Sequence, residues 1–380
     1  MPKRSRSPKR MEVLTGMEGR MGRAQVPAGE RWVMPKAGSL GSLARESFDV
    51  SDLEVLDDML LIQVECIGLN FADIFACQGL YSATPQGGFV PGLEFSGTVL
   101  KVGKSVTAHR EGDRVMGVTR FGAFTTHLVC KAAFLRPLPA GWGFEEGAAF
   151  LCTALTAWYG LVKLGALAKD HTVLVHSAAG GVGLASLEIV AAHGARAIAT
   201  IGSVSKAALL QDRMGLPAGS ILVRAPTSSQ FAAQLDKALA SMPEVEGLDL
   251  VMDSIQGPYF QPAYDKLARG GRVVVFGAAS MTPAGDKPNW LRLAWQWVRR
   301  PMVDPLEVIA ANKGVLGFNL IWLWDKVEEI ADMLEAMMLK VPWKKPFVGA
   351  RYQMNQLPDA VRYLQSGQSV GKVIICVRQA

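Results

Sequence analysis

A glycine-rich turn is the part of this sequence best suited to hold a phosphate. Residues 180–183 lie between a β-branched run, 172–175, and an amphipathic helical segment. Glycine lets the backbone approach a pyrophosphate, whose negative charge lies at the N-terminus of the following helix. Ala178 replaces the first glycine of the usual G-x-G-x-x-G pattern, so the prediction depends on the strand–turn–helix context, and a purely structural turn is the alternative. The predicted nucleotide-binding residues are Gly180, Gly181, Val182 and Gly183.

The residues after the second buried strand indicate which nicotinamide nucleotide would bind. An NAD site would have an Asp or Glu about 20 residues after the glycine turn, where its carboxylate binds the ribose hydroxyl. No acidic residue occurs between Glu188 and Asp212. Ser203 and Lys206 occupy this region instead, and Arg224 ends the third strand. A hydroxyl and two cations suit a 2′-phosphate. We predict NADP(H) as cofactor; a solvated helix face is the alternative for Lys206.

The elements that must position these residues alternate between strand and helix. Buried strand-like segments recur with helical segments between them from residue 153 to 314, which predicts a doubly wound parallel sheet. Before them, short strands and glycine turns over residues 60–118 are typical of a small β-barrel. The chain ends with two predicted helices, 325–340 and 357–365, and a strand, 371–377. The predicted fold class is therefore α/β.

The charge of the chain is unevenly distributed. The formal net charge of +6 comes from the first 45 residues, which hold 10 Lys and Arg against 3 Glu. The remaining 335 residues carry 30 basic and 31 acidic groups, and this near-neutral body does not favour nucleic-acid binding. We predict that residues 1–45 are a disordered tail. Its composition overlaps that of organelle-targeting peptides, so a targeting role stays open.

Cysteine usage and hydropathy indicate a reduced, cytoplasmic protein. The five cysteines are far apart and form neither a zinc-binding nor a disulfide-rich pattern. Charged residues interrupt the most apolar regions, so we expect no membrane-spanning helix and a soluble or peripheral protein. The exception in composition is segment 288–301, which contains three tryptophans and three arginines. A lid over the substrate, a dimer contact and peripheral contact with a membrane all stay open for this segment.

Several motifs, in a fixed order, resemble one enzyme superfamily. LNFADIFACQGLY, PGLEFSGTVLKVGKSV, GDRV, AAGGVG and VGKVII fall within residues 55–378. This order resembles the medium-chain dehydrogenase/reductase superfamily, in its zinc-free quinone oxidoreductase branch, and most of all the group named for synaptic vesicle membrane protein VAT-1. The resemblance implies a GroES-like catalytic β-barrel formed by residues 46–152 and 315–380, a Rossmann NADP-binding domain formed by residues 153–314, an active site between them, and a homodimer.

The positions of the catalytic zinc ligands in related enzymes predict that no metal is bound here. Where those relatives have Cys or His, this chain has Asn70, Leu93 and Cys152, with Glu94 retained after Leu93. One soft ligand cannot hold a tetrahedral zinc. Without a Lewis acid to polarise a carbonyl, we expect reduction of a quinone or an α,β-unsaturated carbonyl, which already delocalises the charge it receives.

The resemblance also assigns individual residues. Asn70 would lie near the nicotinamide and orient the ring or the substrate oxygen, with an Asx-turn as the alternative. Tyr81 matches a proposed proton donor, with a packed phenol as the alternative. Asp73 is expected to cap a helix or form an ion pair. Further cofactor contacts implied by motif position are Thr156, Gly277, Ala278, Phe318, Asn319 and Lys372.

Two hypotheses follow from these patterns. The first is a zinc-independent, NADPH-dependent reductase of quinones or enones, with Tyr81 or water completing the protonation. The second is a membrane-associated protein of the VAT-1 type, which binds lipid and nucleotide and has little or no catalytic activity. In this hypothesis segment 288–301 and the basic tail contact the lipid.

Overall fold

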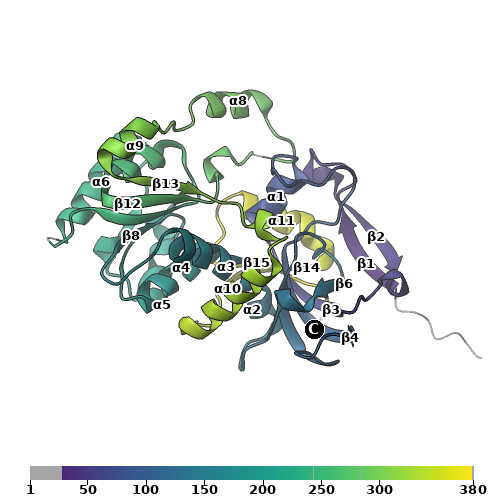
Figure 1. The fold of residues 1–380 in the computed structure, drawn as a ribbon. Coiled ribbons are helices and arrows are strands. Elements are labelled where there is room, and N and C mark those ends of the chain that lie inside the picture. Colours follow the sequence, from purple (N-terminus) through teal and green to yellow (C-terminus); the bar gives the residue numbers. More distant parts are fainter. Residues whose placement is uncertain (1–27, 243, 284, 379–380) are drawn as a thin grey trace, which may run out of the picture.

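The computed structural model describes residues 28–378, except residues 243 and 284. Two large sheets organise these residues, a six-stranded sheet covered by helices and a seven-stranded sheet that curls into a barrel, and a third sheet has only two strands. Figure 1 shows the two parts side by side, with the final strand of the chain between them. We call them the nucleotide domain and the barrel domain.

The nucleotide domain contains a parallel sheet. In the sheet the strands follow the order β10-β9-β8-β11-β12-β13, and every neighbouring pair is parallel. Numbered along the chain, this is the order 3-2-1-4-5-6 of doubly wound dinucleotide-binding folds. The predicted doubly wound sheet is therefore confirmed. Its strands are β8 (Thr172–Val175), β9 (Arg196–Ile201), β10 (Ile221–Val223), β11 (Leu248–Asp253), β12 (Leu267–Val275) and β13 (Gly314–Gly317).

Helices cover both faces of this sheet. Along β8 the side chains alternate, so that Val173 and Val175 belong to one buried cluster and Leu174 to another. The first face packs against α3 and α4, and the second against α6 and α7. The helices of this domain are α3 (Leu151–Trp158) with its π-helical continuation (Tyr159–Leu164), α4 (Gly181–Ala192), α5 (Ala207–Met214), α6 (Ser228–Ala240) and α7 (Phe260–Asp265).

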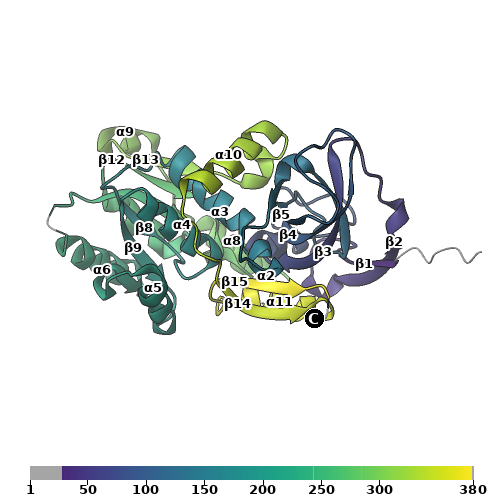
Figure 2. The same cartoon turned by 90° about the horizontal axis from the view of Figure 1, so that it is seen from below.

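The barrel domain is completed by the end of the chain. Its path of strands is β14-β15-β3-β4-β5-β7, and β6 pairs with β3. The last strand, β15, runs antiparallel to β3 and parallel to β14. Figure 2 shows β14, β15 and α11 against the early barrel strands. The strands are β3 (Met59–Gly68), β4 (Glu94–Val102), β5 (Arg114–Val118), β6 (His127–Lys131), β7 (Leu135–Pro137), β14 (Val348–Gln353) and β15 (Lys372–Cys376), and the helices are α1 (Phe71–Cys77), α2 (Phe144–Ala148), α10 (Val327–Lys340) and α11 (Leu357–Gln365).

The predicted disordered tail is too long. Residues 28–45 are ordered, since β1 (Ala28–Val33) and β2 (Ala44–Asp49) form an antiparallel pair. Trp32 and Met34 are buried, and the Trp32 indole donates a hydrogen bond to the Met354 carbonyl at 2.8 Å. The prediction was made from the average composition of 45 residues, in which these few apolar side chains have little weight. The prediction for residues 1–27 falls outside the residues that the structure describes.

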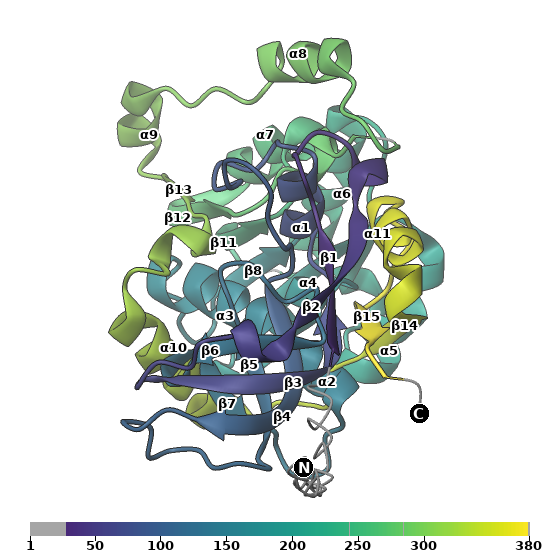
Figure 3. The same ribbon diagram turned by 90° about the vertical axis from the view of Figure 1, so that its right-hand side faces the viewer.

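Between β12 and β13 the chain forms an outlying pair of helices, α8 (Trp290–Val298) and α9 (Pro305–Ala311). Figure 3 shows them at the edge of the molecule, apart from the helices that cover the sheet. β13 starts at Gly314 and pairs with β12, so the sixth strand crosses the expected domain boundary between residues 314 and 315.

Within the part of the chain that the structure describes, one helical stretch, Phe144–Leu164, is long and apolar enough by composition to cross a membrane. Its most apolar window is 67% buried inside the protein, which is typical of a core helix.

Candidate active site

A cavity of about 1320 Å³ lies between the two domains. The nucleotide domain contributes the glycine turn and the residues that follow the carboxyl ends of β8, β9, β11, β12 and β13. The barrel domain contributes α1, the loop after it and the start of β15. Doubly wound sheets bind ligands at this edge. The volume is sufficient for a dinucleotide together with a small substrate.

The glycine turn has the geometry that close backbone approach requires. A Cβ atom added to Gly183 would lie 2.4 Å from the Ser177 carbonyl oxygen and 2.5 Å from the Ala178 Cα, so α4 can contact the turn only with glycine there. Gly180 is the N-cap of α4 in an extended conformation. Ala178 is fully buried. The free N-terminus of α4 faces the cavity, and these residues fit a pyrophosphate.

Two cations line the cavity beyond the end of β9. A Cβ atom on Gly202 would lie 3.1 Å from an Arg224 guanidinium nitrogen, so Arg224 occupies the place where an NAD-specific acid would be expected. Arg224 donates to the Thr200 hydroxyl at 3.1 Å and lies over the Tyr259 ring at 5.6 Å. Burial lowers its pKa, although an arginine stays charged.

Lys206 and Ser203 differ in their placement. The Lys206 ammonium lines the cavity and donates to the carbonyl oxygens of Gly367 and Ser369 at 2.8 and 2.9 Å. Ser203 is not among the lining residues. Its hydroxyl instead accepts a hydrogen bond from the Ser205 N–H at the start of a 3-10 turn. The structure therefore brings Lys206 and Arg224, but not Ser203, to the cavity wall.

A buried polar cluster lies where the barrel domain meets the glycine turn. Lys372 Nζ donates to Asn70 Oδ1 at 2.6 Å and forms an ion pair with Glu94. Asn70 Nδ2 donates to Glu94 Oε1 at 3.1 Å, and the Cys152 N–H donates to Glu94 Oε2 at 3.1 Å. The side chains of Lys372 and Glu94 are only 5% and 1% exposed. Removal of one partner from such a pair typically costs about 3–5 kcal/mol.

Asp73 caps the helix that begins after Asn70, which confirms one of the two roles expected for it. The Asn70 N–H donates to Asp73 Oδ2 at 2.8 Å, and both groups of a capping box are present. Burial raises the pKa of Asp73 to about 7, against the opposing effect of its backbone hydrogen bonds. This helix cap fixes the direction in which Asn70 enters the cluster.

Tyr81 and Asn319 meet across the cavity from distant parts of the chain. The Tyr81 hydroxyl donates to Asn319 Oδ1 at 2.6 Å. Asn319 Nδ2 in turn donates to the Ser82 hydroxyl at 3.3 Å. Burial raises the pKa of Tyr81, so the phenol remains protonated at neutral pH. The sequence named both residues from motif position, and the structure brings them together at the apolar end of the cavity.

The remaining predicted residues line the same cavity. Thr156 donates to the Cys152 carbonyl at 2.7 Å, and Phe318 packs edge-on against Tyr159 at 5.0 Å. Gly277 and Ala278 follow β12, and a Cβ atom on Gly277 would lie 2.8 Å from the Ser254 carbonyl oxygen.

Sequence reasoning missed Ser254, Gln256 and Tyr259, which line the cavity after β11. Gln256 donates to the Gly277 carbonyl at 2.8 Å and so fixes the neighbouring loop. These residues follow the carboxyl end of a predicted parallel strand, and that position alone would have indicated them.

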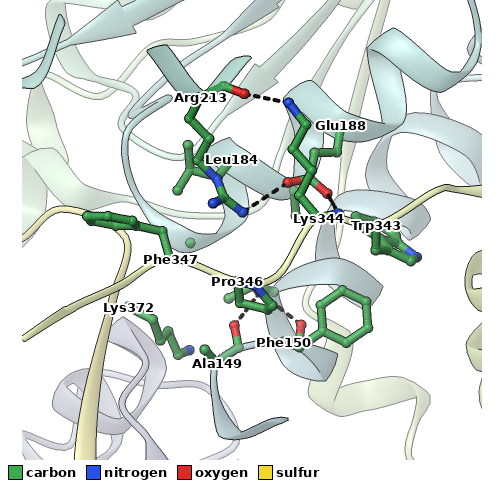
Figure 4. Close-up of a pocket in the computed structure, with 13 residues that line it drawn as sticks. Ala149, Phe150, Leu184, Glu188, Arg213, Trp343, Lys344, Pro346, Phe347 and Lys372 are labelled. Atoms are coloured by element: carbon green, nitrogen blue, oxygen red, sulfur yellow. Dashed lines mark hydrogen bonds and ion pairs between the residues drawn. The ribbon is translucent and has the colours of Figure 1, made fainter. Parts of the chain in front are cut away.

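A much smaller crevice, of about 30 Å³, lies on the other side of α4 (Figure 4). Glu188 pairs with Arg213 at 3.5 Å and accepts a hydrogen bond from the Lys344 N–H at 3.0 Å. Figure 4 shows these groups directed toward one another above Pro346. The crevice has room for about one water molecule. Its ion pair joins the nucleotide domain to the segment that leads into β14.

The fold and the cavity define a two-domain protein with a dinucleotide-type sheet and a small β-barrel. The alcohol dehydrogenase GroES-like domain family matches residues 57–166, and the zinc-binding dehydrogenase family matches residues 227–375. The chain belongs to the medium-chain dehydrogenase/reductase superfamily, and its barrel is GroES-like as predicted.

Individual relatives agree with this assignment. The synaptic vesicle membrane protein VAT-1 homolog of Danio rerio is 32% identical over 83% of this chain and 63% of its own length. The human (Homo sapiens) homolog is 31% identical over 83% of this chain and 78% of its own length. The match therefore spans less than two thirds of the fish protein. The structure of mycobacterial Rv1454c complexed with NADPH is 27% identical, with a TM-score of 0.75 over 92% of this chain and 100% of that chain.

The residues at the zinc position do not fit the metal that one of these family names implies. Leu93 packs with Ala83 and Ile321 in a buried apolar cluster, and Glu94 is already paired with Lys372. Among residues 28–378, apart from the two gaps, no group of three His, Cys, Asp or Glu side chains could hold a metal ion. Cys152 alone is insufficient for tetrahedral zinc.

Proposed function

We propose that the protein is an NADPH-dependent reductase of quinones or α,β-unsaturated carbonyl compounds. The observation that carries the proposal is the large cavity between the domains, whose lining includes the two cations, Lys206 and Arg224, and the hydrogen-bonded pair of Tyr81 and Asn319. The superfamily assignment supports an oxidoreductase, and the fold is shared with a mycobacterial protein complexed with NADPH.

The preference for NADPH rests on charge at the end of β9. Arg224 lies against Gly202, and Lys206 lines the same wall. Both groups are partly buried, and the desolvation that results lowers the pKa of each. Charge-assisted hydrogen bonds to a phosphate would restore the interactions that these cations lose on leaving water. NADH has no 2′-phosphate and would leave Arg224 without a phosphate partner.

The residues at the other end suit an electron-poor carbonyl acceptor. Bound NADPH would supply a hydride. Tyr81 holds a proton on its hydroxyl oxygen and would donate it to the carbon or oxygen left electron-rich in the acceptor, while Asn319 orients that hydroxyl. Leu93 and Ile321 provide an apolar wall that limits access of water. The Lys372 ammonium fixes Asn70 beside this wall. A quinone or enone needs no metal to accept the electrons.

Binding and turnover together test the proposal. NADPH should raise the melting temperature of the purified protein more than NADH at the same concentration, because ligand binding to the folded state stabilises it. The absorbance of the reduced nicotinamide should then fall when quinones or conjugated enones are added. A protein that bound neither nucleotide, or bound NADPH without reducing any acceptor in a broad panel, would contradict the proposed function.

The exposure of α8 supports a second candidate, peripheral attachment to an acidic membrane. Trp290, Leu291 and Val298 are 66%, 87% and 75% exposed. Arg299 and Arg300 lie over the rings of Trp295 and Trp297 at 4.2 and 4.1 Å. Exposed tryptophan combined with arginine is typical of helices at membrane interfaces. Trp290 and Trp297 also line the cavity, so the same helix would border the substrate entrance.

Flotation with liposomes tests this second candidate. Binding to phosphatidylserine vesicles should weaken with added salt and should fall in the Leu291→Ser/Val298→Ser variant. Leu100→Ser, a change at an exposed residue of β4, is the matched control. Equal flotation of all three proteins, or none with the wild type, would exclude a role of α8 in membrane binding.

A further inference from the structure

Two cysteines lie directly opposite each other where the last strand joins the barrel. In the register of β15 and β3, Cys376 faces Cys66. The next pair along these strands is hydrogen-bonded, with the Val377 N–H donating to the Glu65 carbonyl at 2.9 Å. Hydrogen-bonded and non-hydrogen-bonded pairs alternate in antiparallel strands, so Cys66 and Cys376 form a non-hydrogen-bonded pair, in which Cα atoms lie about 4.5 Å apart.

This spacing permits a covalent bond between the two sulfur atoms without movement of the backbone. Disulfides are found with Cα separations of about 4.4–6.8 Å, so the pair lies at the short end of the accepted range. Disulfides away from the preferred geometry are the more easily reduced ones. The other cysteines, Cys77, Cys130 and Cys152, lie on α1, β6 and α3.

The surroundings make the two thiols chemically unequal. Cys66 is buried, whereas Cys376 is half-buried. A hydrogen bond between the two thiols lowers the pKa of Cys376, and together with burial it raises the pKa of Cys66. The Glu145 carboxylate, whose Oε1 lies 3.8 Å from Cys376 Sγ, partly opposes this effect by raising the pKa of Cys376. Arg351, whose Nε donates to the other oxygen of that carboxylate at 2.7 Å, lowers the pKa of Cys376. Cys376 is therefore the thiol that ionises first and that a small oxidant can reach.

We propose that Cys66 and Cys376 are a redox modification site. A peroxide oxidises the two thiols, and a reversible disulfide forms between them. The Cys376 thiolate attacks one oxygen of hydrogen peroxide, the O–O bond breaks, and Cys376 becomes a sulfenic acid while hydroxide leaves and is protonated to water. The Cys66 sulfur then attacks the Cys376 sulfur. The hydroxyl group leaves with the Cys66 proton as a second water. Two thiols are oxidised by two electrons and the peroxide is reduced.

The bond would join the two strands that hold the buried cluster of the active site. Lys372 begins β15, and Asn70 follows the end of β3, with Lys372 Nζ and Asn70 Oδ1 2.6 Å apart. A disulfide at Cys66–Cys376 would prevent the last strand from separating from the barrel. It would close a loop that spans most of the chain, and loops of this length give the largest expected loss of unfolded-state entropy.

Peptide mapping of the native, full-length protein tests the proposal directly and does not depend on the reductase activity. After brief treatment with hydrogen peroxide and alkylation of the free thiols, we expect a Cys66–Cys376 cross-linked peptide that dithiothreitol removes. The melting temperature of the oxidised protein should rise by about 2 °C or more and return on reduction.

Two substitutions provide the controls. Cys376→Ser should abolish the cross-link and the shift in melting temperature, and Cys130→Ser, a change at a buried cysteine of β6, should leave both unchanged. The proposal is overturned if wild-type protein treated with peroxide keeps both thiols free, or if Cys376 is overoxidised while Cys66 remains a thiol.

Discussion

Replacement of Arg224 by glutamine should weaken the binding of NADPH much more than the binding of NADH. The change keeps much of the side-chain length but removes the cation that lies against Gly202. A hydrogen bond to a charged group contributes about 1.5–3 kcal/mol, which corresponds to a rise of about 10- to 150-fold in the dissociation constant for NADPH. The dissociation constant for NADH should change by less than about threefold, since it lacks the phosphate.

The measurement is a calorimetric or fluorescence titration of each protein with NADPH and NADH at one ionic strength, because salt screens the charges. Arg196→Gln is the matched control, because Arg196 lies on the same domain, outside the cavity lining, and pairs with Asp170 at 3.9 Å. Equal weakening of both nucleotides by Arg224→Gln would show that the residue acts through the fold. Unchanged NADPH affinity would place the 2′-phosphate elsewhere.

Three further predictions concern the turn, the buried carboxyl group and the phenol. Gly183→Ala should lower the free energy of unfolding by about 1–3 kcal/mol in denaturant titrations, because its Cβ would contact the Ser177 carbonyl, whereas Gly219→Ala, where nothing lies within 4 Å, should have little effect. Asp73 has a pKa of about 7 in the folded protein against 3.8 for an unperturbed aspartate, so the folded state binds more protons between these values. Wild-type stability relative to Asp73→Asn should therefore fall as pH rises from 4 to 7 and stay level above 7, by an amount of order 4 kcal/mol; a flat difference would show that the carboxyl is not buried. Tyr81→Phe should lower kcat for enones about 100-fold with little change in NADPH affinity, and an unchanged kcat would assign protonation to water.

The parts of the fold that follow from local pattern were predictable. Runs of β-branched residues separated by helices are enough to indicate the parallel sheet, and the glycine turn identifies its binding edge. The prediction of disorder from composition was wrong for residues 28–45. Two buried side chains, Trp32 and Met34, anchor this segment, although the rest of it is polar and basic. No local pattern could place β15 between β14 and β3, since that pairing joins residues about 300 positions apart.

The site was predicted residue by residue, but its contacts were not. Motif position named Asn70 and Lys372 separately, and only the tertiary structure shows that their side chains share a hydrogen bond and that Glu94 completes the cluster. Tyr81 and Asn319 are a second such pair. Ser203 was selected for its chemistry, yet it lies outside the cavity lining, where its hydroxyl caps a short 3-10 turn.

The most direct test of the central claim is a single-turnover experiment on the complex with NADPH. Protein in excess over NADPH is mixed rapidly with a quinone or a conjugated enone, and the absorbance of the reduced nicotinamide is followed. We predict that the absorbance disappears in one exponential phase, far faster than with the same reagents without protein. A stable complex whose nicotinamide remains reduced with every acceptor would contradict the assignment of this cavity as a reductase active site.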